Sequence, residues 1–316
     1  MKSKIIHCLK STDEFFSGEE LSSKLHISRA AIWKHMQELR KEGYSIDAVP
    51  HRGYKLRSTP DKLLPEEVNF GLETKVIGQR VHYYKTIPTT MEKAYELAME
   101  GAEEGTVIIA EAQTKGKGRM GRAWVSPKGK GIYLSLILRP QLPPTDVAKL
   151  TLLCAVACCG AIRKETGLNV TIKWPNDLLI DGKKFAGILT ELNAEIQQVR
   201  FIVVGIGINI SAKDDMLPEG ATSLQKELGQ KISRVRLTQA IFESLERWYD
   251  CVEDGFGPVL EQWKKMSSTL GNKVRMEDPY GSVEGEAVDL DEYGGLVIRT
   301  ASGEVVKRMS GDVINL

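Results

Sequence analysis

An excess of either charge is missing from this sequence, since 43 lysine and arginine residues are balanced by 42 aspartate and glutamate residues. With a net charge of +1, no chain-wide field favours nucleic acid or a membrane surface as a partner. An apolar run of signal-peptide length is also missing, and we expect no stretch that approaches a membrane span. These absences predict a cytoplasmic protein with no membrane partner.

Cysteine is scarce, with five residues in the chain, three of them in the apolar run 152–160. Their spacing fits neither a zinc pattern nor a redox Cys-x-x-Cys pair. We interpret them as small core side chains in a reducing compartment. No Ser-His-Asp or Cys-His arrangement is apparent either, and we expect no metal held by protein side chains alone.

Composition divides the chain into three predicted domains, of residues 1–60, 65–266 and 268–316. The head, 1–60, is helix-rich and ends at a proline; the body mixes strands and helices; the tail has short alternating strands with glycine and aspartate turns, typical of a small β-barrel. The head holds eleven basic residues against seven acidic ones, whereas the rest holds 32 against 35. A basic head predicts a polyanion-binding module attached to another activity.

Capping signals in the head predict two helices joined by a tight turn. Ser17 and Glu20 form a capping box at the start of the first helix, which runs through His26. Ser28 is placed to cap the second helix, which ends at Gly43. The second helix carries an apolar stripe for the core, formed by Ile32, Met36 and Leu39.

The head continues with two alternating segments, 44–49 and 53–56, which predict a β-hairpin. Two helices followed by a hairpin resemble a winged helix-turn-helix, a module whose second helix enters the major groove of DNA. The residues placed to meet bases or phosphates are Ser28, Arg29, Trp33, Lys34, Gln37, Arg52 and Lys55. A helical protein-interaction module with an ordinary basic face is the alternative.

In the body, residues 116–121 spell the dinucleotide-binding pattern G-x-G-x-x-G, but their context argues against that reading. No long helix follows and no βαβ unit with a downstream acid closes the motif. The glycines let the backbone bend around a ligand, while Lys117, Arg119 and Arg122 surround it with positive charge. The segment therefore predicts a loop for a phosphate-bearing anion; a solvated basic loop is the alternative.

The most informative stretch is residues 173–191, which reads as a strand, a tight Asp181-Gly182 turn and a second strand. The turn brings Lys183 and Lys184 beside a rigid sheet, where a cation can face an anionic reactant. A solvated hairpin tip is the alternative if these residues are considered alone.

The Lys-Trp-Pro-Asn-Asp block before this hairpin resembles the signature of the biotin protein ligases. Further segments occur in the order this family has them: residues 89–90, 113–119, 122–124, 187–189 and 205–209. With the head and the tail, the resemblance covers nearly the whole chain and is closest to the bifunctional bacterial type, a biotin ligase and biotin-operon repressor in one polypeptide. It implies a central domain like class II aminoacyl-tRNA synthetases and an SH3-like β-barrel tail.

The resemblance also implies roles for particular residues. A biotin site would comprise Thr89, Thr90, Met91, Gln113, Lys117, Gly118, Arg119 and Lys184, with Lys184 and Arg119 acting at the reacting carboxylate. An ATP and adenylate site would comprise Arg122, Trp124, Lys173, Asn176 and Asn209. Two positions depart from the family pattern: Lys117 replaces an arginine, and Met91 stands where a polar residue is common.

The implied reaction agrees with these residue types. A carboxylate is a poor electrophile, so biotin is first converted with ATP to a mixed anhydride, biotinyl-5'-AMP. Cationic side chains together with Mg²⁺ would offset the repulsion between the two anionic reactants. A lysine of the acceptor, the biotin carboxyl carrier protein of acetyl-CoA carboxylase or a similar domain, then attacks as a neutral amine.

The family pattern implies that the adenylate also acts as corepressor, promoting a homodimer that binds operator DNA. A sheet edge near residues 187–195 would serve either self-association or the carrier domain by strand addition. Two other functions stay open at this point. A lipoate or octanoyl transferase shares the architecture, and a pure repressor would bind biotin without exchanging pyrophosphate.

Overall fold

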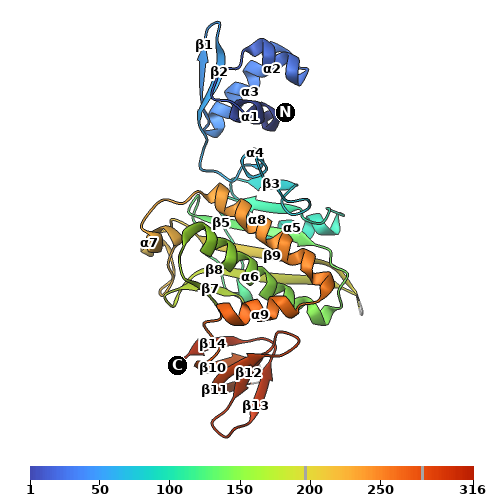
Figure 1. The fold of residues 1–316 in the computed structure, drawn as a ribbon, viewed down its shortest axis with the longest axis vertical. Coiled ribbons are helices and arrows are strands. Elements are labelled where there is room, and N and C mark those ends of the chain that lie inside the picture. Colours follow the sequence, from blue (N-terminus) through green and yellow to red (C-terminus); the bar gives the residue numbers. More distant parts are fainter. Residues whose placement is uncertain (196–197, 279–280) are drawn as a thin grey trace. The chain divides into compact units, whose positions relative to one another are not determined.

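The computed structural model describes residues 1–195, 198–278 and 281–316, which divide into two units, residues 1–72 and 73–316 (Figure 1). This division differs from the three predicted domains in two respects. The linker beyond residue 60 packs with the head, up to residue 72, and the tail shares a unit with the body.

The first unit contains the predicted helix-turn-helix and hairpin. Its elements are α1 (Lys2–Lys10), α2 (Gly18–Leu25), α3 (Arg29–Glu42), β1 (Ser45–Val49), β2 (Gly53–Ser58) and α4 (Pro65–Val68). The capping box is confirmed, because Ser17 Oγ accepts from the Glu20 amide at 3.0 Å and the Glu20 carboxylate accepts from the Ser17 amide at 2.8 Å. Ser28 caps α3, and Gly43 ends it at φ 109°. The predicted apolar stripe of α3 is fully buried.

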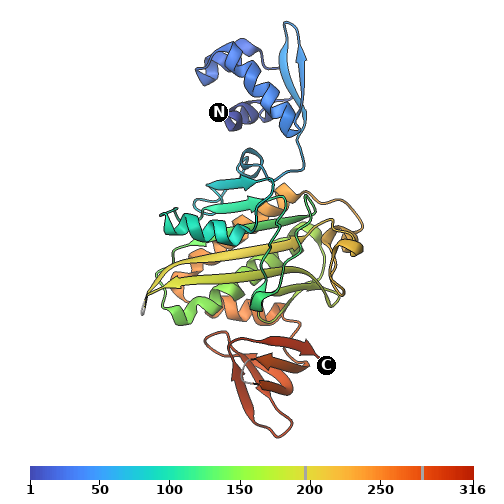
Figure 2. The same ribbon diagram turned by 180° about the vertical axis from the view of Figure 1, so that it is seen from behind.

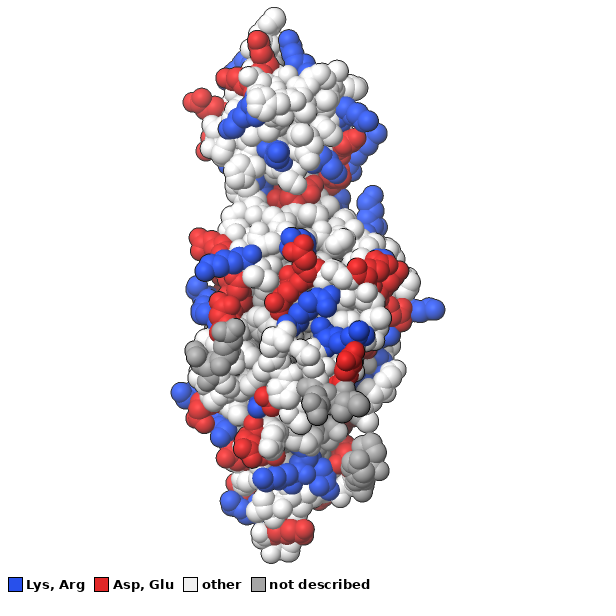
Figure 3. All heavy atoms as spheres, turned by 90° about the vertical axis from the view of Figure 1, so that its right-hand side faces the viewer, with Lys and Arg blue, Asp and Glu red and all other residues white. Residues whose placement is uncertain are grey.

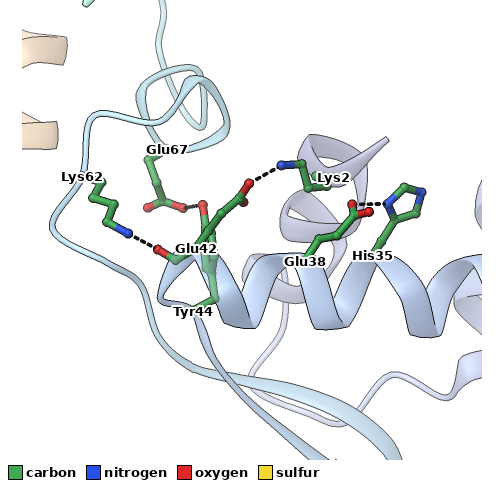
Figure 4. Close-up of polar contacts among 7 residues, drawn as sticks. All are labelled: Lys2, His35, Glu38, Glu42, Tyr44, Lys62 and Glu67. Atoms are coloured by element: carbon green, nitrogen blue, oxygen red, sulfur yellow. Dashed lines mark hydrogen bonds and ion pairs between the residues drawn. The ribbon is translucent and has the colours of Figure 1, made fainter. Parts of the chain in front are cut away.

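A polar network, shown in Figure 4, fastens the linker to the helical head. Tyr44 Oη donates to Glu67 Oε1 at 2.8 Å, and Lys10 Nζ pairs with the other oxygen of Glu67 at 2.8 Å. Glu42, at the end of α3, pairs with Lys2 of α1. Because Glu67 is 3% exposed, its two partners offset the cost of burying its charge. Helix α4 thereby belongs with the head.

The second unit is built on a seven-stranded sheet in the order β3-β4-β5-β9-β8-β7-β6, antiparallel except for the β3–β4 pair. The strands are β3 (Val81–Tyr84), β4 (Val107–Ala110), β5 (Gly131–Leu138), β6 (Val170–Lys173), β7 (Asp177–Ile180), β8 (Lys183–Ala194) and β9 (Val199–Asn209). Strands β4 and β5 are buried throughout, as expected for the centre of a sheet covered on both faces.

Helices cover one face of this sheet (Figure 1). The helices of this unit are α5 (Thr90–Met99), α6 (Val147–Thr166), α7 (Leu224–Leu228), α8 (Arg234–Asp250) and α9 (Gly257–Met266), with 3-10 turns η1 (Arg119–Gly121), η2 (Pro144–Asp146), η3 (Asp214–Met216) and η4 (Cys251–Asp254). On that face α6 packs against both α8 and α9. Figure 2 shows the opposite face, where α5 and the segment between β4 and β5 lie over the strands.

Helix α6 corrects one expectation. Residues 144–166 are long and apolar enough to cross a membrane by length and composition, since they contain an 18-residue window with a mean hydropathy of 1.7. The expectation that no stretch approaches a membrane span is therefore wrong on those grounds. The apolar window is 61% buried, however, and the helix packs on α8, α9 and the sheet, which is the environment of a core helix.

The cysteines of α6 are core residues, as predicted. Cys154, Cys158 and Cys159 are buried, and burial raises the pKa of the Cys159 thiol to about 11. A thiol with so high a pKa is almost entirely protonated at neutral pH and is a poor nucleophile or metal ligand. Cys8 is also buried, whereas Cys251 is half-buried.

The tail forms a five-stranded antiparallel sheet in the order β13-β12-β11-β10-β14. Its strands are β10 (Lys273–Asp278), β11 (Gly281–Leu290), β12 (Leu296–Arg299), β13 (Val305–Arg308) and β14 (Asp312–Asn315). The outer strands β13 and β14 do not pair with each other over the described residues, so this is an open sheet and not the closed barrel that the spacing predicted.

Glu66, beside the polar network of the head, makes the stability of this unit depend on pH. It is 9% exposed, its Oε1 has no hydrogen-bond partner, and burial raises its pKa above the usual 4.5. Because the folded state keeps this proton to higher pH than the unfolded state, the contribution of Glu66 to stability is greatest below about pH 4.5 and is lost as pH rises through the raised pKa.

We therefore expect Glu66→Gln to make residues 1–72 more stable at pH 7 and to flatten this pH dependence. Hydrogen exchange of peptides from that unit, in the full chain and corrected for intrinsic rates, measures both effects. Glu19→Gln, at an exposed glutamate of α2, is the control and should change neither. If the stability of this unit depended on pH as strongly in Glu66→Gln as in the wild type, Glu66 would not be the source of that dependence.

Candidate functional site

The β7–β8 hairpin places Lys184 in a cleft on the face of the sheet opposite α6 and α8. The turn residues Asp181 and Gly182 have φ values of 47° and 76°, the left-handed pair that a two-residue hairpin requires. Lys184 Nζ lies 2.7 Å from Asp177 Oδ1 and 5.6 Å from the centre of the Trp124 ring. Lys183 Nζ instead lies 3.7 Å from Glu227 Oε1. The two lysine side chains point in different directions, as successive residues of a strand do.

Glycines on the two central strands make room for the walls of this cleft. Gly187 of β8 is directly paired with Gly207 of β9. A Cβ at Gly207 would lie 2.5 Å from Trp124 Cε2, and one at Gly187 would lie 3.2 Å from Trp124 Cζ3. A Cβ at Gly205 would lie 2.5 Å from the sulfur of Met91. Trp124 and Met91 therefore lie directly on backbone, where side chains would otherwise stand.

The basic loop folds back on itself as a small hairpin. The Gly118 amide donates to the Arg122 carbonyl at 2.7 Å, and the Trp124 amide donates to the Gly116 carbonyl at 2.8 Å. The only helical turn at this motif is η1, three residues long, whereas a dinucleotide motif opens a long helix. The prediction that G-x-G-x-x-G is not a dinucleotide motif here is therefore confirmed. Met120 lies at the tip with φ 54° and 61% of its surface exposed.

A chain of hydrogen bonds forms the other end of the cleft. Gln113 Oε1 accepts from the Thr90 amide at 2.8 Å and from Thr90 Oγ1 at 3.1 Å, while Gln113 Nε2 donates to Ser126 Oγ at 2.9 Å. Ser135 of β5, which is fully buried, donates to Thr90 Oγ1 at 2.8 Å. Each of these side chains is therefore held in one orientation before any ligand binds.

The cleft gathers most of the residues predicted for it. Those lining it are Thr90, Met91, Gln113, Lys117, Gly118, Arg119, Arg122, Trp124, Asn176 and Lys184. Asn209 lines an adjoining pocket together with Trp124 and Lys184. Thr89 and Lys173 are not among the lining residues; Thr89 is buried and its hydroxyl accepts from the Met91 amide at 3.3 Å, as the cap of α5.

Several contributors were not predicted. They are Ser126, Leu134, Ser135, Asp177, Ile188 and Asp312, together with the glycines at 187, 205 and 207. Asp177 stands inside the signature block, two residues after a proline, and its partner Lys184 lies across the hairpin. The alternation of side chains along the two strands of the hairpin would have indicated that pairing. Asp312 comes from the tail, and no local signal in the sequence connects it to the cleft.

Each cation of the cleft has a polar partner in the structure. Arg119 Nη1 donates to Asn176 Oδ1 at 3.1 Å, Lys117 Nζ lies 3.1 Å from Glu92 Oε1, and Arg122 pairs with Asp312. Burial lowers the pKa of Arg119 from the usual arginine value. Lys/Arg and Asp/Glu side chains are interspersed on the face shown in Figure 3, consistent with local pairing instead of a broad field.

The head carries a second surface, a groove between the start of α3 and the hairpin. Arg29 and Trp33 line it, and 59% of the Trp33 surface is exposed. At the hairpin tip the Arg52 guanidinium lies 4.4 Å from the centre of the Phe15 ring. The other predicted DNA-binding residues, Ser28, Lys34, Gln37 and Lys55, do not line the groove; they are exposed or half-buried, and Ser28 accepts from the Ala31 amide at 3.2 Å.

The contact of Trp124 with glycine backbone can be tested by adding one methyl group. We expect Gly207→Ala to displace Trp124 and to destabilise the second unit by about 2 kcal/mol, because the new Cβ would overlap the indole ring. Urea unfolding and the emission of the indole measure the two effects.

Gly160→Ala, within helix α6, is the matched control, since the nearest atom to its added Cβ is the Met266 Cε of α9, at 3.9 Å. That change should be neutral or stabilise by up to about 1 kcal/mol. Equal stability of the two variants would contradict the packing described here.

Three family models match the chain. The Biotin/lipoate A/B protein ligase family matches residues 83–209, an HTH domain matches residues 2–55, and the Biotin protein ligase C terminal domain matches residues 269–314. The first match spans the cleft from β3 to Asn209. The second spans the helix-turn-helix and most of its hairpin.

Among curated proteins, the chain is 43% identical over 305 residues to the bifunctional ligase/repressor BirA of Bacillus spizizenii, covering 95% of this chain and 94% of that protein. It is 31% identical to the Escherichia coli protein of the same name, over 96% of this chain and 94% of that protein. Among solved structures, the Aquifex aeolicus biotin protein ligase in complex with biotin and ATP matches with a TM-score of 0.66 and 27% identity, covering 75% of this chain and all of that one. The chain therefore belongs to the biotin protein ligase family, in its bifunctional ligase/repressor type.

Proposed function

We propose that this protein forms biotinyl-5'-AMP from biotin and ATP and transfers the biotin to a lysine of the biotin carboxyl carrier protein of acetyl-CoA carboxylase or similar domains. We further propose that it represses genes of biotin synthesis and uptake. The observation that carries the ligase assignment is the convergence of Lys184, Arg119 and Lys117 on one cleft whose floor is glycine backbone and whose wall is Trp124.

The two ends of the cleft suit the two ends of biotin. The Thr90–Gln113 network supplies fixed polar groups for the ureido ring, with Thr89 capping the helix behind them. Met91 and Leu134 give apolar walls for the aliphatic chain, so a methionine at position 91 is compatible with the site. The carboxylate would then lie at the basic end, near Lys184 and Arg119.

The pocket shared by Trp124, Lys184 and Asn209 suits the adenylate. Asn209 Nδ2 donates to the Thr222 carbonyl at 3.2 Å, whereas its Oδ1 is buried without a hydrogen-bond partner. An adenine amino group would satisfy that acceptor, and the exposed face of Trp124 would stack on the base. Asn176, Arg122 and Lys173 would act around the phosphates, Asn176 through the orientation of Arg119.

In the first step a biotin carboxylate oxygen attacks the α-phosphorus of ATP and an O–P bond forms. The bond from the α-phosphorus to the oxygen that bridges to the β-phosphorus breaks, and its electron pair leaves on pyrophosphate. Lys184, Arg119 and Lys117 would stabilise the charge that develops on the phosphoryl oxygens. Mg²⁺ would enter with the nucleotide, held mainly by phosphate oxygens and water. The part of the chain that the structure describes has no cluster of three or more His, Cys, Asp or Glu side chains arranged to hold a metal.

Repression would couple to catalysis through the edge of β8. Strand β7 pairs with β8 only as far as Gly187, so that over residues 189–194 β8 pairs with β9 alone among the described strands. An unpaired edge can accept another strand. We propose that adenylate-bound copies dimerise through this edge, that the carrier domain competes for it, and that the homodimer binds operator DNA through α3 and the hairpin.

The remaining assignments are part of the same proposal. The protein would act in the cytoplasm, the central domain would share the class II synthetase-like architecture of the family, and the tail would correspond to its SH3-like domain. The predicted domains of residues 1–60, 65–266 and 268–316 are retained as functional divisions. A lipoate ligase is separated from this proposal by replacing biotin with lipoate in the exchange assay.

Biotin-dependent ATP–pyrophosphate exchange tests the ligase assignment most directly. We expect Lys184→Ala to reduce exchange by about 100-fold or more, because a cation that faces the developing charge is lost. Lys183→Ala, one residue earlier and near Glu227, is the matched control and should retain exchange. Biotin binding without any exchange in the wild type would instead favour a sensor with no catalytic activity.

Binding to duplex DNA of mixed sequence tests the head. We expect Arg29→Ala to weaken binding and to reduce the slope of log K against log salt by about one, because one phosphate contact is lost. Lys4→Ala, at an exposed lysine on α1, should leave both unchanged. If Arg29→Ala bound DNA as the wild type does, α3 would not be the DNA-contacting helix.

A further inference from the structure

A groove lies between helix α6, strand β8 and the C-terminal sheet, beside the cleft proposed for the adenylation step. Ala148 and Leu152 of α6 form one wall, and Met309, in the turn before β14, contributes from the other side. Thr151 Oγ1 and Thr190 Oγ1 hydrogen-bond at 2.8 Å and so satisfy each other. No residue that lines this groove is acidic, and Arg119 is its one charged group among the described residues.

The groove adjoins the ligand cleft, because Arg119, Ile188 and Leu189 line both. Arg119 is also the side chain that Asn176 holds at the basic end of the cleft, where the carboxylate and phosphate of the adenylate would lie. The groove therefore meets the cleft beside the position proposed for the adenylate.

We propose that this groove receives the side chain of the acceptor lysine, a proposal that rests on the ligase function above. A lysine side chain is a flexible aliphatic stem with an amine at its tip, and apolar walls suit the stem. The amine must be neutral to attack. The lack of a carboxylate and the nearby guanidinium of Arg119 both disfavour the ammonium form and would lower the pKa of the amine.

The position of the groove also fits a carrier bound by strand addition. Leu189 and Thr190 belong both to the groove and to the part of β8 whose outer edge has no strand partner among the described residues. A carrier strand added at that edge would place alternate side chains on the α6 side of the sheet. One of these positions would direct its lysine into the groove.

The transfer then balances without a covalent enzyme intermediate. The lone pair of the neutral amine forms a C–N bond to the acyl carbon of the mixed anhydride. The C–O bond to phosphate breaks, and its electron pair leaves on AMP. The proton released from the nitrogen passes to solvent.

The experiment narrows the groove and separates the two half-reactions in the full chain. Ala148→Leu adds bulk at a half-buried helical position, and Met309→Trp does so at a position that is 47% exposed. We expect each to lower kcat/KM for transfer to a biotin carboxyl carrier domain by about tenfold, while ATP–pyrophosphate exchange changes by less than about twofold. Hydroxylamine, a nucleophile without an aliphatic stem, should still capture the adenylate at the wild-type rate.

Ala301→Leu, in the exposed turn between β12 and β13, is the control and should change none of these rates. Wild-type transfer in both narrowed variants would overturn the proposal, as would an equal loss of hydroxylamine capture. If Ala148→Leu disturbed folding and lost ATP–pyrophosphate exchange, the transfer and exchange rates of Met309→Trp would decide whether the proposal holds. Loss of self-association with transfer intact would assign the groove to a second copy of the chain and refute the proposal. Absence of exchange in the wild type would refute the ligase function itself.

Discussion

The cleft depends on one steric constraint, the absence of side chains at three positions on the two central strands. Gly187 and Gly207 are paired neighbours, and Trp124 lies against both; Gly205 accommodates Met91 in the same way. Alanine at position 207 would already overlap the indole, so the wall, the floor and the position of the basic loop are fixed together. A tryptophan held on backbone also presents a rigid face, which loses little entropy when a flat ligand stacks on it.

Electrostatics adds a second constraint, because the cations of the cleft are already paired. Lys184 with Asp177, Lys117 with Glu92 and Arg122 with Asp312 neutralise one another in the structure described here. An anionic ligand must displace these carboxylates, so part of its binding energy is used to rearrange the loop. Arg119 differs, since its hydrogen-bond partner is the neutral amide of Asn176, while Asp312 and Asp177 act on its charge through space. It lies where the cleft meets the groove that we propose for the acceptor lysine.

Local signals predicted the elements better than they predicted the site. The capping box, the Asp-Gly turn and the apolar runs specify their structures through neighbouring residues, and those elements were found. The roles of Thr90 and Gln113 followed only from resemblance, since their partners lie far along the chain: Ser135 is 45 residues from Thr90, and Gln113 is 23 residues from it. Helix α1 was not foreseen, and neither was the packing of the linker by Glu67, because both depend on tertiary contacts. The described residues of the tail form no closed barrel, since alternation specifies strands and not the closure of a sheet.

The tail, for which the sequence indicated no catalytic role, helps to position the cleft. Trp174 in the signature block is 2% exposed; its amide donates to Thr269 Oγ1 at 2.9 Å, and its Nε1 donates to the Gly294 carbonyl at 3.1 Å. These bonds fix the short turn that carries Asn176 and Asp177, the partners of Arg119 and Lys184. The tail thus reaches the reacting centre in two ways, through Trp174 from behind and through Asp312 at the basic loop. A carrier bound beside β8 would touch the same sheet at Met309, so acceptor docking and cleft geometry share one structural support.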